Sequence, residues 1–96
     1  MNAAPKNIGP RPPKSVIGFY LGSRQLLTAL YGRWLDERGH ENIDDYLAPF
    51  ESIAEKHAVC LVRMTARPFG IEYSHGGKRW RTTVSQSGGY QLRRIA

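Results

Sequence analysis

The hydrophobic residues change their spacing at His57, and this change limits the chain to a fold that mixes helices and strands. Before His57 they recur at the spacing of one helix face, whereas after it they alternate, as in strands that are buried on one side. The helical half precedes the stranded half, so the sequence predicts an α+β fold. We expect two helices packed on a small antiparallel β-meander of three to four strands.

The first helix is predicted to run from Ser23, whose hydroxyl can cap it, to Gly39, which is suited to end it. Its stripe of large side chains is expected to lie in the core, because a small domain needs such residues to fold. These are Leu26, Leu27, Leu30, Tyr31, Trp34 and Leu35. The preceding segment, Val16 to Leu21, is either a short strand or the lead-in to this helix, since Gly18 and Gly22 blur its periodicity.

The second helix is predicted to follow Asn42, which can cap it, with Asp45 placed as in a capping box. Pro49 interrupts the pattern, and its missing N–H must kink or split the helix near Ala48. The apolar face is expected to join the core through Ile43, Tyr46, Leu47, Phe50, Ile53 and Ala54. The solvated face is expected to carry Asp44, Asp45, Glu51 and Glu55.

Alternating polarity predicts four strands, with the glycine pairs Gly76-Gly77 and Gly88-Gly89 as turns. The predicted strands are Ala58 to Ala66, Phe69 to Ser74, Arg79 to Val84 and Tyr90 to Ile95. The side chains expected to face the helices are Phe69, Ile71, Tyr73, Trp80, Thr82, Val84 and Tyr90.

Residues 1–15 are predicted to be a disordered, basic, proline-rich tail, and residues 16–96 a single small α+β domain. Such a tail either has no role or is an arm that becomes ordered on a partner. About eighty residues around one modest core leave little room for a buried catalytic cleft. The chain is therefore expected to act through its surface and not as an enzyme.

The charge is divided into three blocks along the chain. Residues 1–35 carry +5, residues 36–55 carry −6 and residues 56–96 carry +7, which sum to the net charge of +6. An acidic block between basic ends makes the molecule dipolar, so it is a poor match for a protein that simply coats nucleic acid. Oriented docking on a partner of mixed charge fits this distribution better.

The sequence shows no pattern of a catalytic or metal site. Cys60, the single cysteine, lies in the apolar run from Ala58 to Val62, so we expect a small core residue without a disulfide. Pairing it with His57 as nucleophile and base would ignore this predicted burial. The histidines lack the spacing of metal ligands, so no metal or cofactor is expected. Because no apolar run resembles a signal peptide or a membrane span, we expect no membrane partner and a cytoplasmic location.

Arginines are predicted on the outward face of the sheet. Arg79 and Arg81 alternate around Trp80, and Arg93 projects from the next strand, with Arg63, Arg67, Lys78 and Arg94 nearby in sequence. Guanidinium groups on a sheet can hold phosphates, so a small basic nucleic-acid-binding module is the alternative function. Against it, the aromatic side chains are expected on the inward face, where they cannot stack on bases.

Pro68 interrupts the two apolar strands within Arg67-Pro68-Phe69-Gly70. An X-Pro bond loses most of the trans preference, so this junction can hold the chain in one of two shapes, although most such prolines are trans turn residues. Our hypothesis is that the bond is cis when a partner is bound.

Taken as a whole, the chain resembles the anti-RecBCD protein 2 family, small accessory recombination proteins of lambdoid temperate phages. The likeness covers the whole chain, and it rests on the length, the opening Met-Asn-Ala-Ala-Pro-Lys, the basic character and the Ala66-Arg67-Pro68-Phe69 junction.

The resemblance implies a phage-encoded, non-catalytic modulator in the host bacterial cytoplasm. It would bind the host RecBCD helicase-nuclease through the RecC subunit and alter its processing of double-strand DNA ends in favour of phage recombination. A host peptidyl-prolyl isomerase is implied as a second partner, at Pro68. The residues expected to contact partners are Arg67, Pro68 and Phe69 at the junction and Arg79, Arg81 and Arg93 on the sheet. A weak contact with DNA is expected at the three arginines of the sheet.

Overall fold

The computed structural model describes residues 11–37 and 42–96. Residues 1–10 of the predicted tail, the predicted helix end at Gly39 and the side chain of His40 lie outside these residues. The described elements are α1 (Lys14–Glu37), the 3₁₀ helix η2 (Ile43–Phe50), α2 (Glu51–Lys56), β1 (Cys60–Ala66), β2 (Phe69–His75), β3 (Lys78–Val84) and β4 (Tyr90–Arg94). This order of helices and strands confirms the predicted α+β fold.

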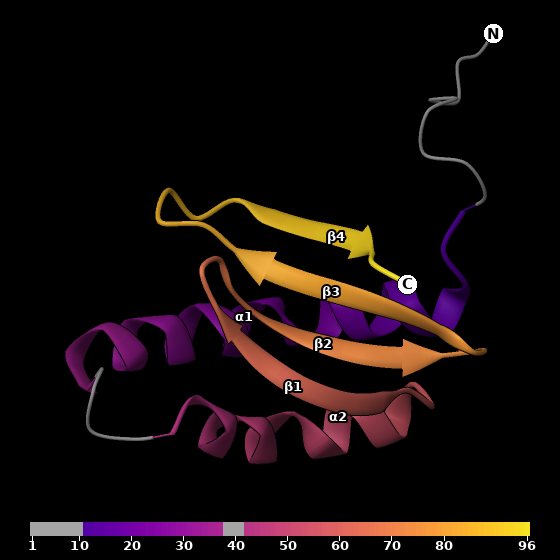
Figure 1. Cartoon of the computed structure of the whole chain (residues 1–96), viewed down its shortest axis with the longest axis horizontal. Coiled ribbons are helices and arrows are strands. Elements are labelled where there is room, and N and C mark those ends of the chain that lie inside the picture. Colours follow the sequence, from indigo (N-terminus) through magenta and orange to yellow (C-terminus); the bar gives the residue numbers. More distant parts are fainter. Residues whose placement is uncertain (1–10, 38–41) are drawn as a thin grey trace, which may run out of the picture.

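The four strands form one antiparallel sheet in the order β1-β2-β3-β4. In Figure 1 the sheet lies in front of α1, which contacts β2 and β3, while η2 and α2 run along β1. Within the described residues no helix covers the other face of the sheet, which we call the open face. The molecule therefore has a helical layer and a stranded layer with one core between them.

The first helix begins at Lys14, well before the predicted start at Ser23. Pro13 immediately precedes it and accepts a hydrogen bond from the N–H of Ile17 at 3.0 Å, as expected for a proline at a helix start. The segment from Val16 to Leu21, which the sequence left open, is therefore helical, and α1 also takes in the last two residues assigned to the tail.

Ser23 lies inside α1, so its prediction as a helix cap is wrong. Its buried hydroxyl donates instead to the carbonyl of Phe19 at 2.6 Å, one helical turn back. The nearby Gly18 allows α1 to pack against the end of α2, because a Cβ there would lie 2.5 Å from the ring of His57. The helix α1 therefore continues through Gly18 and Ser23 because it packs against the rest of the protein there.

Pro49 divides the second predicted helix, as the sequence indicated. Asn42 accepts a hydrogen bond from the N–H of Asp44 at 2.9 Å and caps η2, and α2 begins after Phe50. Asp44 is exposed, as predicted for the solvated face, and it also makes a contact that the sequence did not predict. Its carboxylate accepts the N–H of Met64 in β1 at 3.0 Å and so ties η2 to the edge of the sheet.

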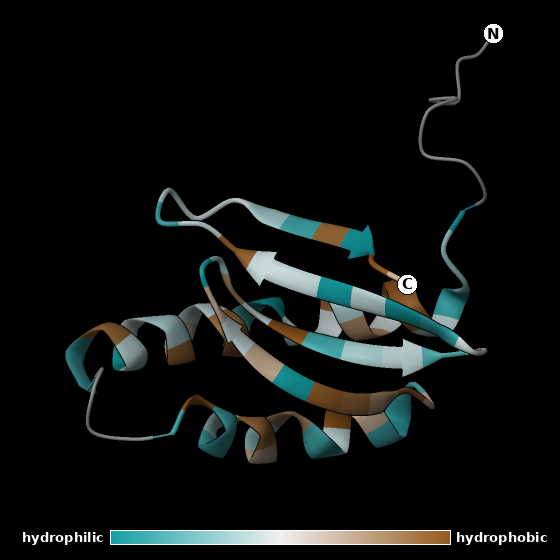
Figure 2. Cartoon of the chain, viewed as in Figure 1, coloured by the Kyte–Doolittle hydropathy of each residue, from teal (hydrophilic) through white to brown (hydrophobic). Residues whose placement is uncertain are grey.

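The core lies between α1, η2 and the helix-facing side of the sheet (Figure 2). Phe19 of α1 meets Tyr73 of β2 with ring centroids 4.3 Å apart, and it meets Phe50 of η2 at 6.3 Å. Tyr73 donates to the carbonyl of Val16 at 3.3 Å, and burial raises its pKa to about 12. The predicted inward residues Phe69, Ile71, Tyr73, Trp80, Thr82 and Val84 are all buried, and Tyr90 is partly buried.

β1 begins at Cys60 and not at Ala58, which has a left-handed φ of 57°. Cys60 is exposed, so its prediction as a core residue is wrong. The reason is register: Cys60 pairs with Ser74, whereas the next residue, Leu61, pairs with the buried Tyr73. Since successive side chains alternate between faces, Cys60 lies on the open face.

Candidate protein-binding surfaces

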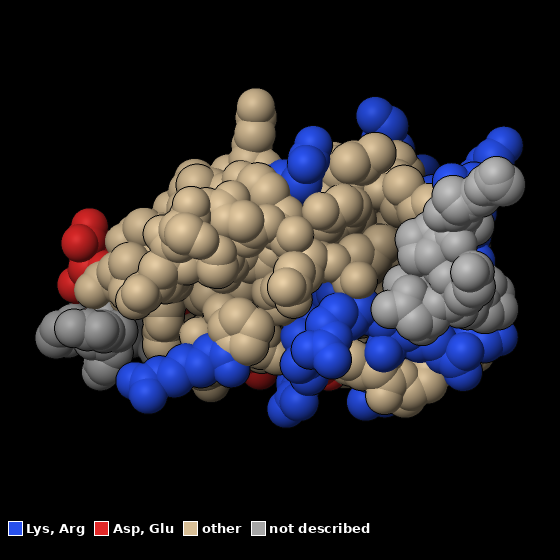
Figure 3. Space-filling model, turned by 90° about the horizontal axis from the view of Figure 1, so that it is seen from above, with Lys and Arg blue, Asp and Glu red and all other residues tan. Residues whose placement is uncertain are grey.

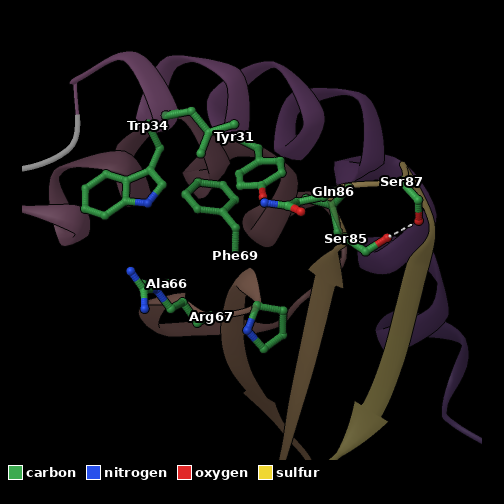
Figure 4. A pocket seen from close by; sticks show the side chains of 11 residues that line it. Tyr31, Trp34, Ala66, Arg67, Phe69, Ser85, Gln86 and Ser87 are labelled. Carbon is green, nitrogen blue, oxygen red and sulfur yellow. Dashed lines mark hydrogen bonds between the residues drawn. The ribbon is translucent and has the colours of Figure 1, made fainter.

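A groove of about 970 Å³ lies where α1 meets two connections of the sheet (Figure 4). One wall is the C-terminal half of α1, and the others are the β1–β2 turn and the β3–β4 loop. Its lining includes Tyr31, Trp34 and Leu35 from α1, Arg67 and Pro68 from the turn, and Gln86 from the loop.

Stacked aromatic rings form the interior of this groove. Phe69 is 1% exposed, and its ring lies 5.3 Å from that of Tyr31 and 6.4 Å from that of Trp34. Trp34 also meets Tyr46 edge to face at 6.0 Å. These contacts hold the rings in place, so the groove presents a largely preformed apolar surface.

Leu35 belongs to this groove and not to the core, because it is 41% exposed. Its prediction as a core residue is therefore wrong, and Trp34 is only partly buried. Both positions fit the helical stripe, but that stripe extends past the edge of the sheet that covers it. Periodicity alone cannot separate the covered part of such a stripe from the uncovered part.

The three junction residues have different positions in the groove. Arg67 and Pro68 are exposed, and the peptide bond between them is cis. The hydroxyl of Thr65 donates to the carbonyl of Pro68 at 2.9 Å and closes the turn. Phe69 points into the core and packs beneath the aromatic residues of the groove. Arg67 and Pro68 are accessible to a partner.

The open face of the sheet carries a buried carboxylate held by two arginines. Glu72 is 1% exposed; Arg63 donates from Nε and Nη2 at 3.1 and 3.2 Å, and Arg81 donates from Nη2 at 2.7 Å. The pKa of Glu72 is held below its ordinary value, first by the Arg63 hydrogen bond and also by Arg81, although burial opposes this shift.

Strand register places these residues in one line across the sheet. Arg63 pairs with Glu72, Glu72 with Arg81, and Arg81 with Arg93. We call these four residues the cross-sheet row. Arg79 is exposed on the same face, and Lys and Arg side chains line the lower border of Figure 3, where this face lies.

The basic residues grouped in the sequence therefore fall on different surfaces. Arg79, Arg81 and Arg93 share the open face as predicted, whereas Arg67 lies in the groove. Arg94 pairs with the buried Trp80, so its side chain is on the helix-facing side. The predicted arginine-rich face is thus smaller than the count of basic residues suggests.

Sequence reasoning missed two features of these surfaces. Glu72 carried a signal, because it is the single acidic residue in residues 56–96 and would fall on the outward face of an alternating strand. Gln86 had no such signal, because a polar residue in a loop does not indicate which part of the folded protein the loop approaches.

Comparison with known proteins adds no relative: no protein-family model matches the chain, and no curated protein or solved structure matches it. In residues 11–37 and 42–96, no helix is long and apolar enough to span a membrane. The same residues contain no cluster of three or more His, Cys, Asp or Glu side chains placed to hold a metal ion.

Proposed function

We propose that the chain is a non-catalytic, phage-encoded protein that binds the host RecBCD helicase-nuclease through RecC in the host bacterial cytoplasm. Binding would alter the processing of double-strand DNA ends in favour of phage recombination, with a host peptidyl-prolyl isomerase as a second partner at Pro68. The identity of both partners comes from the family resemblance. The groove supplies a surface for protein binding.

The groove is the observation that carries this proposal. It brings the exposed Arg67 and Pro68 beside Trp34 and the exposed Leu35. Protein-binding surfaces are enriched in aromatic residues and arginine, and their contacts centre on well-packed pockets. A rigid aromatic wall with an adjacent arginine suits an apolar partner segment that ends in a polar or acidic group.

The open face gives weaker support to the alternative, a nucleic-acid-binding module. Glu72 lies within the cross-sheet row, and both Arg63 and Arg81 already direct donors to its carboxylate. The buried aromatic residues of the sheet face the helices, so they cannot stack on bases. We therefore expect weak DNA contact that falls steeply with salt.

A direct test compares the two partners under one condition. Purified protein is titrated against RecBCD and against duplex DNA at physiological salt, and complexes are detected by fluorescence anisotropy. Saturable binding to RecBCD with much weaker binding to duplex is expected. Tight DNA binding without a RecBCD complex would overturn the proposal.

The role of the groove is tested with a matched pair of variants on α1. Leu35 lines the groove and is 41% exposed, whereas Leu21 is 51% exposed and does not line it. Leu35→Glu should weaken RecBCD binding by about tenfold or more, as for the loss of an interface anchor. Leu21→Glu should bind like the parent, and both should melt close to it. Equal binding by the two variants would exclude the groove from the interface.

A further inference from the structure

The outer edge of β4 carries backbone groups beside which the described part of the chain places no strand. β4 is the last strand in the sheet order, so within residues 11–37 and 42–96 one of its edges has no partner strand. The N–H of Ser85 bonds to the carbonyl of Gly89 at 2.9 Å, and that of Ile95 bonds to the carbonyl of Arg79 at 2.8 Å. In an antiparallel strand, the N–H and C=O groups of successive residues point alternately to the two edges of the strand. The groups of Gly89 and Ile95 point toward β3, so those of Leu92, three residues from each, point to the outer edge.

The side chains along this edge differ between the two faces. Arg93 lies on the open face directly opposite Arg81, and like charges in such a cross-strand pair destabilise a sheet. No carboxylate of the described residues forms an ion pair with Arg93. On the other face Leu92 is only partly buried against the core. The edge thus offers an unpaired positive charge beside an incompletely covered apolar side chain.

We propose that β4 accepts an extended segment of a partner protein as a fifth strand of the sheet. The segment alternates acidic residues, which lie beside Arg93 on the open face, with apolar residues, which lie beside Leu92. A carboxylate next to Arg93 would continue the alternation of charge that Arg63, Glu72 and Arg81 begin across the sheet. Main-chain hydrogen bonds would supply affinity, and the two side-chain positions would supply specificity.

Two other occupants fit the edge less well. A second copy of this chain would bring together two strands that each carry Arg93 and Arg94, with no acidic residue in β4 to offset them. Nucleic acid can neutralise Arg93 but has no backbone that matches a strand edge. None of the groove's lining residues belongs to β4, so this surface is separate from the one in the proposed function.

The experiment measures amide hydrogen exchange by NMR in the full chain, with a short peptide of alternating glutamate and valine as the probe. Saturating peptide should slow exchange of the Leu92 N–H by about tenfold or more, because that group becomes hydrogen-bonded. A peptide of alternating lysine and valine and a duplex DNA are the comparison ligands. Neither should protect the Leu92 amide.

Charge-reversal variants test the side-chain contribution. Arg93→Glu should weaken binding of the glutamate–valine peptide by roughly three- to tenfold, from the size of cross-strand charge pairs, and should favour the lysine–valine peptide. Lys56→Glu makes the same change in net charge on α2, which packs beside β1 at the other edge, and should bind like the parent.

Leu92→Pro removes an outward N–H together with the leucine side chain, and it should abolish binding of the glutamate–valine peptide while the hairpin still forms. Three results would overturn the proposal: no protection of Leu92 at saturating peptide, equal weakening by Arg93→Glu and Lys56→Glu, or protection that requires self-association or duplex DNA.

Discussion

Replacing Glu72 with glutamine should destabilise the fold by about 2 kcal/mol at neutral pH, from the usual worth of hydrogen bonds to charged groups. The carboxylate is 1% exposed and receives donors from both Arg63 and Arg81. Glutamine keeps one acceptor oxygen but turns the other into an NH₂ donor that faces guanidinium donors. The arginine side chains are 59% and 26% exposed, so solvent screening keeps the loss below that of a fully buried pair.

The lowered pKa of Glu72 determines how the stability difference between the parent and Glu72→Gln changes with pH. The pKa of Glu72 is lowered in the folded protein from an ordinary value of 4.5, so its stabilising effect is present above that value. The effect is lost as the pH falls through the lowered folded-state pKa. The difference in stability between the parent and Glu72→Gln should therefore be constant from neutral pH down to about 5 and should shrink in more acidic solution.

Urea denaturation at a series of pH values measures this difference. At neutral pH the variant should also melt roughly 8 to 16 °C below the parent, given the usual shift per kcal/mol in a domain of this size. Glu55→Gln, an exposed carboxylate on α2, is the matched control and should lie within about 0.5 kcal/mol of the parent. Parental stability of Glu72→Gln at neutral pH, or a difference that persists unchanged in acid, would refute the assignment of Glu72 as an ionised, doubly paired group.

Three further predictions concern single positions. Gly70→Ala should destabilise the sheet by about 1 to 3 kcal/mol, because the added Cβ would lie 2.4 Å from the carbonyl oxygen of Thr82; a parental melting temperature would contradict this. The thiol of Cys60 should react with a thiol reagent in the native protein as fast as in urea, and protection would place it back in the core. Leu30→Ala should cost about 2 to 5 kcal/mol in thermal unfolding, since Leu30 is 8% exposed, and a smaller loss would mean that the site collapses around the change.

Local sequence patterns were sufficient for most of the fold. The alternation of Phe69, Ile71 and Tyr73 predicted their burial because a strand has only two faces, and one of them must cover the core. Gly76 and Gly77 predicted the β2–β3 turn, and both have the positive φ values, 61° and 77°, that such a turn requires. Pro49 predicted the division of the second helix for an equally local reason, the missing N–H.

Element boundaries and partly covered faces needed the tertiary structure. Ser23 has the chemistry of a cap, yet α1 passes through it because Val16 and Phe19 are buried against the sheet and extend the helix upstream. Whether Leu35 is core or surface depends on how far the sheet reaches beneath α1, which no spacing in the sequence records. Cys60 was misplaced for a related reason, since its face depends on pairing with a strand that comes later in the chain.

The sequence by itself determined the two periodicities, the turns and the set of side chains able to form a core, because these depend on neighbours along the chain. The sequence also placed Arg79, Arg81 and Arg93 on one face of the sheet, but the tertiary structure decided which residues from different elements combine into the candidate surfaces. The groove joins α1 to two distant connections, and the cross-sheet row takes one residue from each strand. Such groups are set by strand register and by the packing of helix on sheet, and a shift of one residue in register would turn each side chain to the opposite face.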